Sequence, residues 1–331
     1  MMEWVHIPLD QPKVSLGVPV YNGEPYLPAA LDAILAQTFS DFEVIICDNA
    51  STDRTAAIAQ DYVARDKRFR YYRNEENIGA ARNFNRTFEL ASGEYFKWCA
   101  ADDLIAPNYL ETCVAALDAN PAAALCYTRV KVIDDRGKVV GEHLVELEQT
   151  ASDSPSARFG EFIRRSPTCF QVFGLFRADV LRQTPLITGH IGADKMLIAE
   201  ICLRGPILFI PEHLFFSRQH GGRSVKLDRD RLAAWYDPRS SRSRMPTWRR
   251  LAEFLKIVAR VPLSREERWK SYWRVLQWAL SKRNLALFGM DFLNLIAPGS
   301  WSRAWNFYER RFRPRGYSPR YYRYYDSEEA P

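Results

Sequence analysis

The sequence predicts an α/β protein with a mostly parallel central sheet, helices on both faces of it, and a helical, basic extension at the C-terminal end. Over residues 13–120, short apolar runs alternate with polar loops and helical patterns, as in parallel sheets. After residue 240 this alternation stops, and basic and aromatic residues accumulate. At 331 residues, 47% of them hydrophobic, the chain is long enough to bury a large core.

The first half contains four strand-like runs, each followed by a polar loop. KVSLGVPV ends at the turn-like YNGEP, and FEVIICDN ends in a polar cluster where Ser51 or Thr52 is expected to cap the next helix. FRYYRN precedes a loop containing Gly79, and EYFKWCA ends at an acidic pair. The expected strands are therefore residues 13–20, 42–49, 69–74 and 94–100.

Beyond residue 121 the pattern is looser but continues. Strands are expected at residues 123–133 and 206–212, and a helix at 191–205, while residues 146–156 form a polar stretch. We expect a catalytic domain over residues 1–236, with halves of about 13–120 and 121–236. A linker at 237–247 and a helical C-terminal region at 248–331 follow it.

The net charge of +6 is unevenly distributed. Residues 1–240 carry 27 Lys/Arg and 32 Asp/Glu, whereas residues 241–331 carry 19 and 8, together with six of the nine tryptophans. The two regions are therefore expected to have different partners.

The cysteines and the N-terminus indicate a cytoplasmic protein. The six cysteines form no CxxC pair and no cluster at zinc spacing, so buried, reduced thiols are expected. No signal-peptide pattern and no run of about 18 apolar residues occurs.

Asp102 and Asp103 directly follow the fourth expected strand. Two adjacent carboxylates repel each other, and at a strand end they suit a hard cation such as Mg²⁺ or Mn²⁺, which in turn neutralises a diphosphate. The alternative is a solvated turn in which Asp103 caps a helix, and the pair alone favours neither.

Polar residues also follow the second and third strands. Asp48 ends a buried strand, where a carboxylate can accept a hydrogen bond from a ligand N–H. Asn77, Gly79 and Arg82 lie at a loop-to-helix junction, where amides and a guanidinium can meet phosphate or base. Capping and a common Asn-x-Gly turn are the alternatives.

Two residues of the second half could take part in chemistry. Asp194 begins a helix with an apolar side and could serve as a general base, although an acidic residue there commonly just favours the helix dipole. His220 precedes a Gly-Gly pair and could ligate a metal, or be a surface histidine in a loop.

Taken together, these segments resemble the inverting glycosyltransferases of family 2, which have the GT-A fold. Three blocks carry the resemblance, which extends over residues 13 to about 225. They are VSLGVPVYNGEPYLPAALDAILAQTFSDFEVIICDNASTDRT (14–55), NIGAARN (77–83) and GEYFKWCAADDLIAPNYLE (93–111).

The resemblance implies a role for each matching residue. Asp194 would be the catalytic base, although Ala193 stands where the family usually has a second acidic residue. Asp103 would bind Mn²⁺ or Mg²⁺, with His220 completing its shell, and Asp102 would reach ribose or metal. The residues implied to contact the nucleotide are Pro19, Tyr21, Glu24, Asp48, Asn77, Gly79, Arg82 and Asp102.

The implied activity is transfer of a sugar from a nucleotide-diphosphate donor, usually with uracil, to a hydroxyl of a lipid-linked or polysaccharide glycan, with inversion. A dinucleotide-dependent oxidoreductase is disfavoured because the first loop is PVYNGEP rather than GxGxxG. A nucleotidyltransferase would need a Gly-rich loop to hold a triphosphate, and residues 14–30 contain none. A nucleic-acid-binding protein that uses the basic C-terminus is a further, less favoured alternative.

The C-terminal region contains two amphipathic helical patterns, at residues 248–261 and from Ser264 onward, where Ser264 and Glu267 have capping-box spacing. Their apolar sides could lie on an anionic membrane, through residues 248–325, or pack on the catalytic domain or a second subunit. The segment 285–298 is too short to span a bilayer, and a flexible or surface-attached tail is expected after residue 310.

Overall fold

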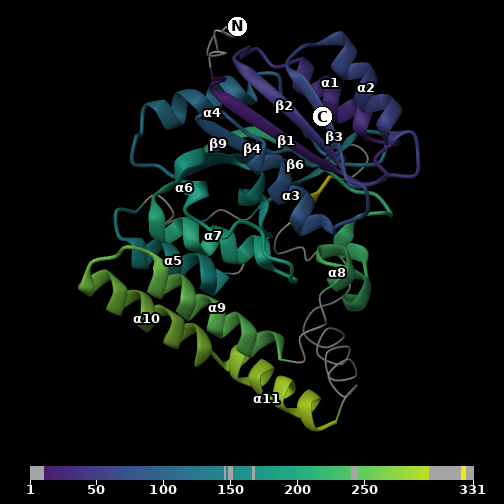
Figure 1. The fold of residues 1–331 in the computed structure, drawn as a ribbon. Coiled ribbons are helices and arrows are strands. Elements are labelled where there is room, and N and C mark those ends of the chain that lie inside the picture. The colour runs from purple at the N-terminus through teal and green to yellow at the C-terminus, as the bar shows by residue number, and fades with distance from the viewer. Residues whose placement is uncertain are drawn as a thin grey trace, which may run out of the picture.

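The computed structural model describes residues 11–144, 147, 152–165, 168–239, 245–297 and 322–325. One mixed sheet lies at the centre, with helices on both of its faces, and three further helices extend along one edge of the molecule (Figure 1). The predicted fold class is confirmed.

The N-terminal half is built on four parallel strands in the order β4-β1-β2-β3. They are β1 (Val14–Val20), β2 (Phe42–Asp48), β3 (Phe69–Arg73) and β4 (Tyr95–Trp98). β1 and β2 are buried along their whole length, which explains why both are continuous apolar runs rather than alternating ones. The carboxyl ends of these strands lie at one edge of the sheet.

The helices of this half cover opposite faces of the sheet. α1 (Leu27–Leu35), α2 (Thr55–Arg65) and α4 (Tyr109–Asp118) share one hydrophobic cluster with β1 and β2. α3 (Ala80–Glu89) contributes Ala81 and Phe88 to a second cluster, which contains Phe96 and Trp98 of β4. Strand β4 thus sends alternate side chains into two cores.

The second half adds antiparallel strands and a long parallel pair. Strand β8 (Leu175–Arg177) joins β4 to β6 (Leu125–Ile133), and β6 also pairs with β7 (Val139–His143) and, in parallel, with β9 (Ile207–Arg218). β9 pairs in turn with β5 (Leu104–Ile105), directly after the acidic pair. β9 extends six residues beyond the predicted strand. Its last residue, Arg218, therefore lies next to Asp102 and Asp103.

The helices of this half and the short 3-10 turns complete the catalytic domain. They are α5 (Pro155–Arg165), η1 (Phe170–Phe173), α6 (Ala178–Arg182), α7 (Ala193–Arg204), η2 (Ser224–Lys226) and α8 (Arg229–Tyr236).

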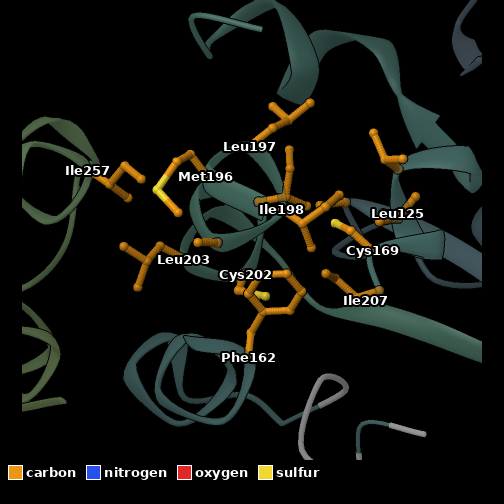
Figure 2. Packing of buried hydrophobic residues seen from close by; sticks show 14 of the residues in the cluster. Leu125, Phe162, Cys169, Met196, Leu197, Ile198, Cys202, Leu203, Ile207 and Ile257 are labelled. Atoms are coloured by element: carbon orange, nitrogen blue, oxygen red, sulfur yellow. The ribbon is translucent and has the colours of Figure 1, made fainter. Parts of the chain in front are cut away.

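The C-terminal region forms three helices, α9 (Pro246–Arg260), α10 (Arg265–Ala279) and α11 (Lys282–Ile296). α9 packs on α7, and α10 on α5 and α9. Figure 2 shows Ile257 of α9 facing Met196 and Leu203 of α7 in one cluster of buried side chains. Part of the apolar side of these helices is therefore buried against the rest of the chain. This agrees with the predicted alternative in which they pack on the catalytic domain.

Two local predictions about helix caps have different outcomes. Ser264 caps α10 by accepting from the backbone N–H of Glu267 (3.2 Å), as predicted. Capping of α2 by Ser51 or Thr52 is wrong, because both bond to the loop of Asn22, and Asp53 instead accepts from the N–H of Thr55 (3.0 Å). Local spacing could not reveal that the neighbouring loop competes for these hydroxyls.

Two features of the C-terminal region were not anticipated. The fully buried Asp291 of α11 accepts from the N–H groups of Thr247 (2.6 Å) and Trp248 (3.3 Å) at the start of α9. Farther on, β10 (Tyr322–Tyr324) pairs antiparallel with β7, so part of the predicted tail is an edge strand. The remaining tail residues lie outside the described ranges, as do residues 240–244 of the predicted linker.

All six cysteines are buried and unpaired, which confirms the prediction of buried thiols. Within the described residues, none of the helices has the length and apolar character needed to cross a bilayer.

Candidate active site

Two loops at the carboxyl edge of the sheet are held together by hydrogen bonds. The backbone N–H groups of Asn22 and Gly23 donate to Ser51 Oγ (2.9 Å) and Thr55 Oγ1 (2.8 Å). Glu24 donates its N–H to Asp53 Oδ2 (3.0 Å), and its carboxylate accepts from the N–H of Arg54 (3.1 Å). The strand-end loops after β1 and β2 therefore form one rigid unit.

The residues of the first loop that are predicted to line the nucleotide pocket differ in exposure. Pro19 is buried within β1, whereas Tyr21, at the loop, is half-exposed. Glu24 already bonds to the start of α2 through its carboxylate. Of the three, Tyr21 presents the most surface to a ligand.

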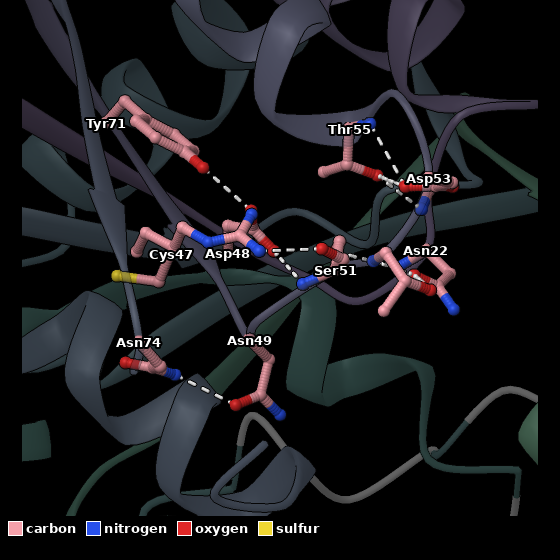
Figure 3. Close-up of polar contacts among 12 residues, drawn as sticks. Asn22, Cys47, Asp48, Asn49, Ser51, Asp53, Thr55, Tyr71 and Asn74 are labelled. Atoms are coloured by element: carbon pink, nitrogen blue, oxygen red, sulfur yellow. Dashed lines mark hydrogen bonds and ion pairs between the residues drawn. The ribbon is translucent and has the colours of Figure 1, made fainter. Parts of the chain in front are cut away.

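Asp48 ends β2 and is fully buried. Its Oδ1 accepts from the N–H of Ser51 (2.8 Å), and its Oδ2 accepts from Tyr71 Oη and Arg73 Nη1 (2.7 Å each), as Figure 3 shows for Ser51 and Tyr71. Burial and the bond to Asp48 raise the pKa of Tyr71. A carboxylate oxygen offers two lone pairs, so a nucleobase would have to use the second one of Oδ1 or displace a donor.

Hydrogen bonds join the loop after β3 to Asn49, the residue that follows Asp48. Asn49 Oδ1 accepts from Asn74 Nδ2 (2.8 Å), a bond drawn in Figure 3, and from the N–H of Ile78 (3.0 Å). Asn77 Oδ1 accepts from Asn49 Nδ2 (2.8 Å) and from the N–H of Gly79 (3.0 Å). The side chain of Asn77 therefore shapes the loop.

Gly79 begins α3 in the left-handed region (φ 86°), and a Cβ there would meet Tyr236 O at 2.7 Å. Glycine is needed because the end of α8 crosses close over this loop. Arg82, one turn into α3, is exposed and makes no ion pair within the described residues, so its guanidinium is available to a phosphate.

Asp102 and Asp103 occupy different environments. The half-buried Asp102 places Oδ2 2.8 Å from His220 Nε2. The N–H of Gly222 donates to His220 Nδ1 (3.2 Å), so the His220 proton is on Nε2, which donates to Asp102. The His220 ring also packs on Tyr26, with ring centroids 4.5 Å apart.

Asp103 is buried, and its Oδ1 accepts from the N–H of Arg218 (2.8 Å). Burial, followed by the charge of Asp102, raises the pKa of Asp103 to about 8. A bound cation would relieve the repulsion between a buried carboxylate and a second one beside it. Two carboxylates and an imidazole are suitable donors for Mn²⁺ or Mg²⁺.

These donors do not form a closed cage. Among the residues that the structure describes, no group of three His, Cys, Asp or Glu converges as a metal site. His220 contacts Asp102 rather than Asp103, so a metal bound by Asp103 and His220 requires that contact to change. Such an open arrangement suits a metal whose remaining ligands are diphosphate oxygens and water.

Arg218 holds the acidic pair from behind, a role that the sequence did not reveal. This nearly fully buried side chain donates from Nε to Asp102 O (2.9 Å) and from Nη1 to Asp134 O and Asp135 O (3.1 Å each). It also lies over the Tyr26 ring, 5.1 Å from the centroid. The only feature of the sequence that pointed to Arg218 was its position two residues before His220. Its partners are backbone carbonyls, which every residue has, so the sequence could not identify them.

Asp194 is the second residue of α7, which follows the left-handed Gly192 (φ 84°). Burial, followed by the charge of the nearby Asp194 carboxylate, raises the pKa of Tyr236. Arg250 of α9 contributes a partly buried positive charge nearby. Because Tyr236 O also lies against Gly79, the end of α8 links the predicted base to the nucleotide loops.

Residues 15–184 match the family model described as glycosyl transferase family 2. Among curated proteins, the chain is 24% identical over 223 residues to glycosyltransferase GlyG of Streptococcus pneumoniae, covering 66% of this chain and 74% of that protein. It is 31% identical over 152 residues to the putative glycosyltransferase EpsH of Bacillus subtilis, covering 46% of this chain but only 42% of EpsH.

Two solved structures share the fold. TarS residues 1–349 of S. aureus, in complex with UDP-GlcNAc, superposes with a TM-score of 0.55 at 18% identity, over 82% of this chain and 73% of that one. The mannosyltransferase PcManGT of Pyrobaculum calidifontis, in complex with GDP-Man and Mn²⁺, gives a TM-score of 0.51 at 16% identity, over 93% and 82%.

Proposed function

The chain belongs to glycosyl transferase family 2, and we propose that this sugar-transferring enzyme uses a nucleotide-diphosphate sugar, most readily a UDP-sugar, to glycosylate a lipid-linked or polysaccharide acceptor with inversion. TarS and PcManGT, which share the fold, were solved with UDP-GlcNAc and GDP-Man. The observation that carries the proposal is the acidic pair at the carboxyl ends of the parallel strands, where Asp102 bonds to His220 and Asp103 is buried beside it.

Within this proposal, the strand-end loops bind the nucleotide. Tyr21 and Asp48 contact the nucleobase, and Pro19 and Glu24 support the first loop. The exposed guanidinium of Arg82, at the loop shaped by Asn77 and Gly79, meets the phosphates.

Asp102, Asp103 and His220 would hold Mn²⁺ or Mg²⁺ at the diphosphate. Such a cation, when bound, supplies positive charge that stabilises the leaving nucleoside diphosphate. Neutralisation by a bound cation would favour the ionised form of Asp103 and thereby lower its raised pKa.

Asp194 takes the proton of the acceptor hydroxyl while that oxygen forms a bond to the anomeric carbon. The bond from this carbon to the diphosphate breaks on the opposite face, and the diphosphate leaves with the electron pair, so a single displacement inverts the centre. Tyr236 and Arg250 lie close enough to Asp194 to interact with its charge, and they form the polar surroundings of the proposed base.

A lipid-linked acceptor would bring the enzyme to a membrane, the partner expected for residues 248–325. The same proposal therefore includes a cytoplasmic enzyme associated with the inner face of the cell membrane. The nucleotidyltransferase and nucleic-acid-binding alternatives gain no support from the family match.

A thermal-shift screen of UDP, GDP, dTDP and CMP sugars, with and without Mn²⁺, tests the donor and the metal. We expect one nucleotide class to raise the melting temperature in a Mn²⁺-dependent way, and Asp103→Asn to abolish that dependence. A shift that is equal with and without Mn²⁺ would refute the metal site.

Asp194→Asn separates catalysis from binding. This variant should keep the nucleotide-induced shift while transfer falls by about 100-fold or more, because only the base is lost. Near-normal turnover of Asp194→Asn would exclude Asp194 as the base.

A further inference from the structure

The C-terminal helices leave an exposed row of apolar side chains after their core-facing sides are buried. α10 buries Ser271, Val275 and Trp278 on one side. The opposite side carries residues spaced by four, three and four positions, which places them on one face of a helix. They are Trp269, Trp273, Leu276 and Leu280, between 44% and 75% exposed.

α11 carries a second row of exposed apolar side chains. Its buried residues Asn284, Leu287 and Asp291 leave the other side to Leu285, Phe292 and Ile296, each more than half exposed. Figure 1 shows α10 and α11 following each other nearly in line along the edge of the molecule away from α1 and α2. Fifteen residues in each helix give a combined length of about 45 Å.

We call the seven exposed residues the α10–α11 stripe. An apolar surface of this extent is costly in water, and on a folded protein it marks a binding surface. Two of its members are tryptophans, the side chain that favours the boundary between lipid and water.

Three cations accompany the stripe. Arg265 lies one turn before Trp269 on the same face, and Lys282 and Arg283 lie at the α10–α11 junction, between Leu280 and Leu285. Within the described part of the chain, all three are exposed and lack an ion-pair partner. Their charges are therefore available to an external anionic surface.

The acidic residues of these helices are engaged elsewhere. Asp291 is buried at the start of α9, and Glu267 accepts from the N–H of Ser156 (2.8 Å) on α5. Glu266 pairs with Lys270 (2.6 Å). The surface beside the stripe is thus positive as well as apolar.

A second copy of the chain is a poorer occupant. In a two-fold dimer centred on the stripe, the same patch contacts itself, so Lys282 and Arg283 near its midpoint would lie close to the axis and face their own copies. Like charges brought together in this way disfavour such an interface.

We propose that the α10–α11 stripe docks the enzyme on an anionic lipid bilayer. The two helices lie in the plane of the interface, with the tryptophans and leucines among the headgroups and upper acyl chains and the three cations at lipid phosphates. This docking narrows the expected membrane contact from residues 248–325 to one face of two helices. It does not depend on which residues bind the metal or the acceptor proton.

Co-sedimentation of the full chain with vesicles tests the docking without any transfer reaction. We expect binding to phosphatidylcholine vesicles containing phosphatidylglycerol, weakened by salt, and far weaker binding to phosphatidylcholine alone. Trp269→Ser/Trp273→Ser should lower the partition coefficient about tenfold or more on the anionic vesicles. Lys282→Ala/Arg283→Ala should lower it by about tenfold there and leave binding to neutral vesicles unchanged.

A matched control is Leu144→Ser/Val225→Ser, which removes two exposed aliphatic side chains from the catalytic domain. It should bind anionic vesicles like the wild type, and nucleotide-induced thermal shifts should be the same in all variants. Wild-type protein that stays in the supernatant, or a tryptophan variant that sediments like the wild type, would overturn the proposal. So would light scattering that shows a dimer dissociated by the tryptophan substitutions, which would assign the stripe to a second copy.

Discussion

At the scale of single residues, the acidic pair depends on one buried arginine. Arg218 satisfies three backbone carbonyls with its guanidinium and Asp103 with its own N–H. The planar guanidinium of arginine carries several N–H donors that point in different directions. A lysine has one compact donor group, which cannot reach all three carbonyls together.

Arg218→Lys should therefore destabilise the protein by about 2–3 kcal/mol, since buried carbonyls lose their donors. Metal-dependent stabilisation by nucleotide should weaken as well, because Asp102 is no longer held. Urea denaturation measures the first effect and thermal shift the second. The exposed Arg136→Lys is the matched control, and equal stability of the two variants would contradict the assigned role.

The sequence predicted that Asp102 and Asp103 act together, but it did not predict that their environments differ. Sequence places Asp102 and Asp103 at the same strand end with the same chemistry. Only the structure shows that β9 covers Asp103 and leaves Asp102 at His220. The roles of ribose contact for Asp102 and metal ligand for Asp103 stay predictions.

At the scale of elements, the pairing of β10 with β7 partly buries a histidine. His143 ends β7, and its ring meets Tyr322 of β10 (centroids 5.1 Å apart) and Phe170 (4.9 Å). Its Nε2 lies 2.7 Å from Thr168 Oγ1. Burial lowers the pKa of His143 to about 4, so the ring is neutral in the folded protein at pH 7.

This lowered pKa predicts acid sensitivity. An unfolded histidine takes up its proton near pH 6.5, so between about pH 6.5 and 4 the unfolded state binds more protons than the folded one. Stability from His143 is therefore present above pH 6.5 and lost as the pH falls toward 4. The change is about 2–3 kcal/mol.

His143→Gln should flatten this dependence. Urea midpoints at pH 7 and pH 4.5 should differ less in His143→Gln than in the wild type. A variant that remains as acid-sensitive as the wild type would assign the effect to other groups.

At the scale of the whole molecule, the C-terminal helices belong to the core of the catalytic domain. Phe254, Ile257 and Val258 of α9 lie in the same cluster as Leu197 of α7 and Phe159 of α5. α9 also contributes Arg250 near Asp194. We therefore expect the two regions to unfold together.

Ile257→Ala tests this expectation. Removing a fully buried side chain should cost about 2–4 kcal/mol. Tryptophan fluorescence and nucleotide binding should report one transition at the same lowered midpoint. Nucleotide binding that survives beyond the fluorescence transition would show an independently stable catalytic domain.

The sequence alone determined the alternation of strands and helices, because buried parallel strands are apolar throughout and polar clusters mark their ends. It also determined which clusters meet at one edge, since the carboxyl ends of parallel strands coincide there. Asp48, Asp102 and the Gly79 loop were found in this way.

Contacts between distant segments were decided only by the tertiary structure. Arg218 with the acidic pair, Tyr236 with Asp194, and Asp291 with α9 join residues 42 to 116 positions apart, and their partners are largely backbone atoms or ordinary polar side chains. The division of the C-terminal apolar surface was decided in the same way. Periodicity shows that a helix has an apolar side, but packing against α5 and α7 decides that Ile257 is core and Trp269 is exposed.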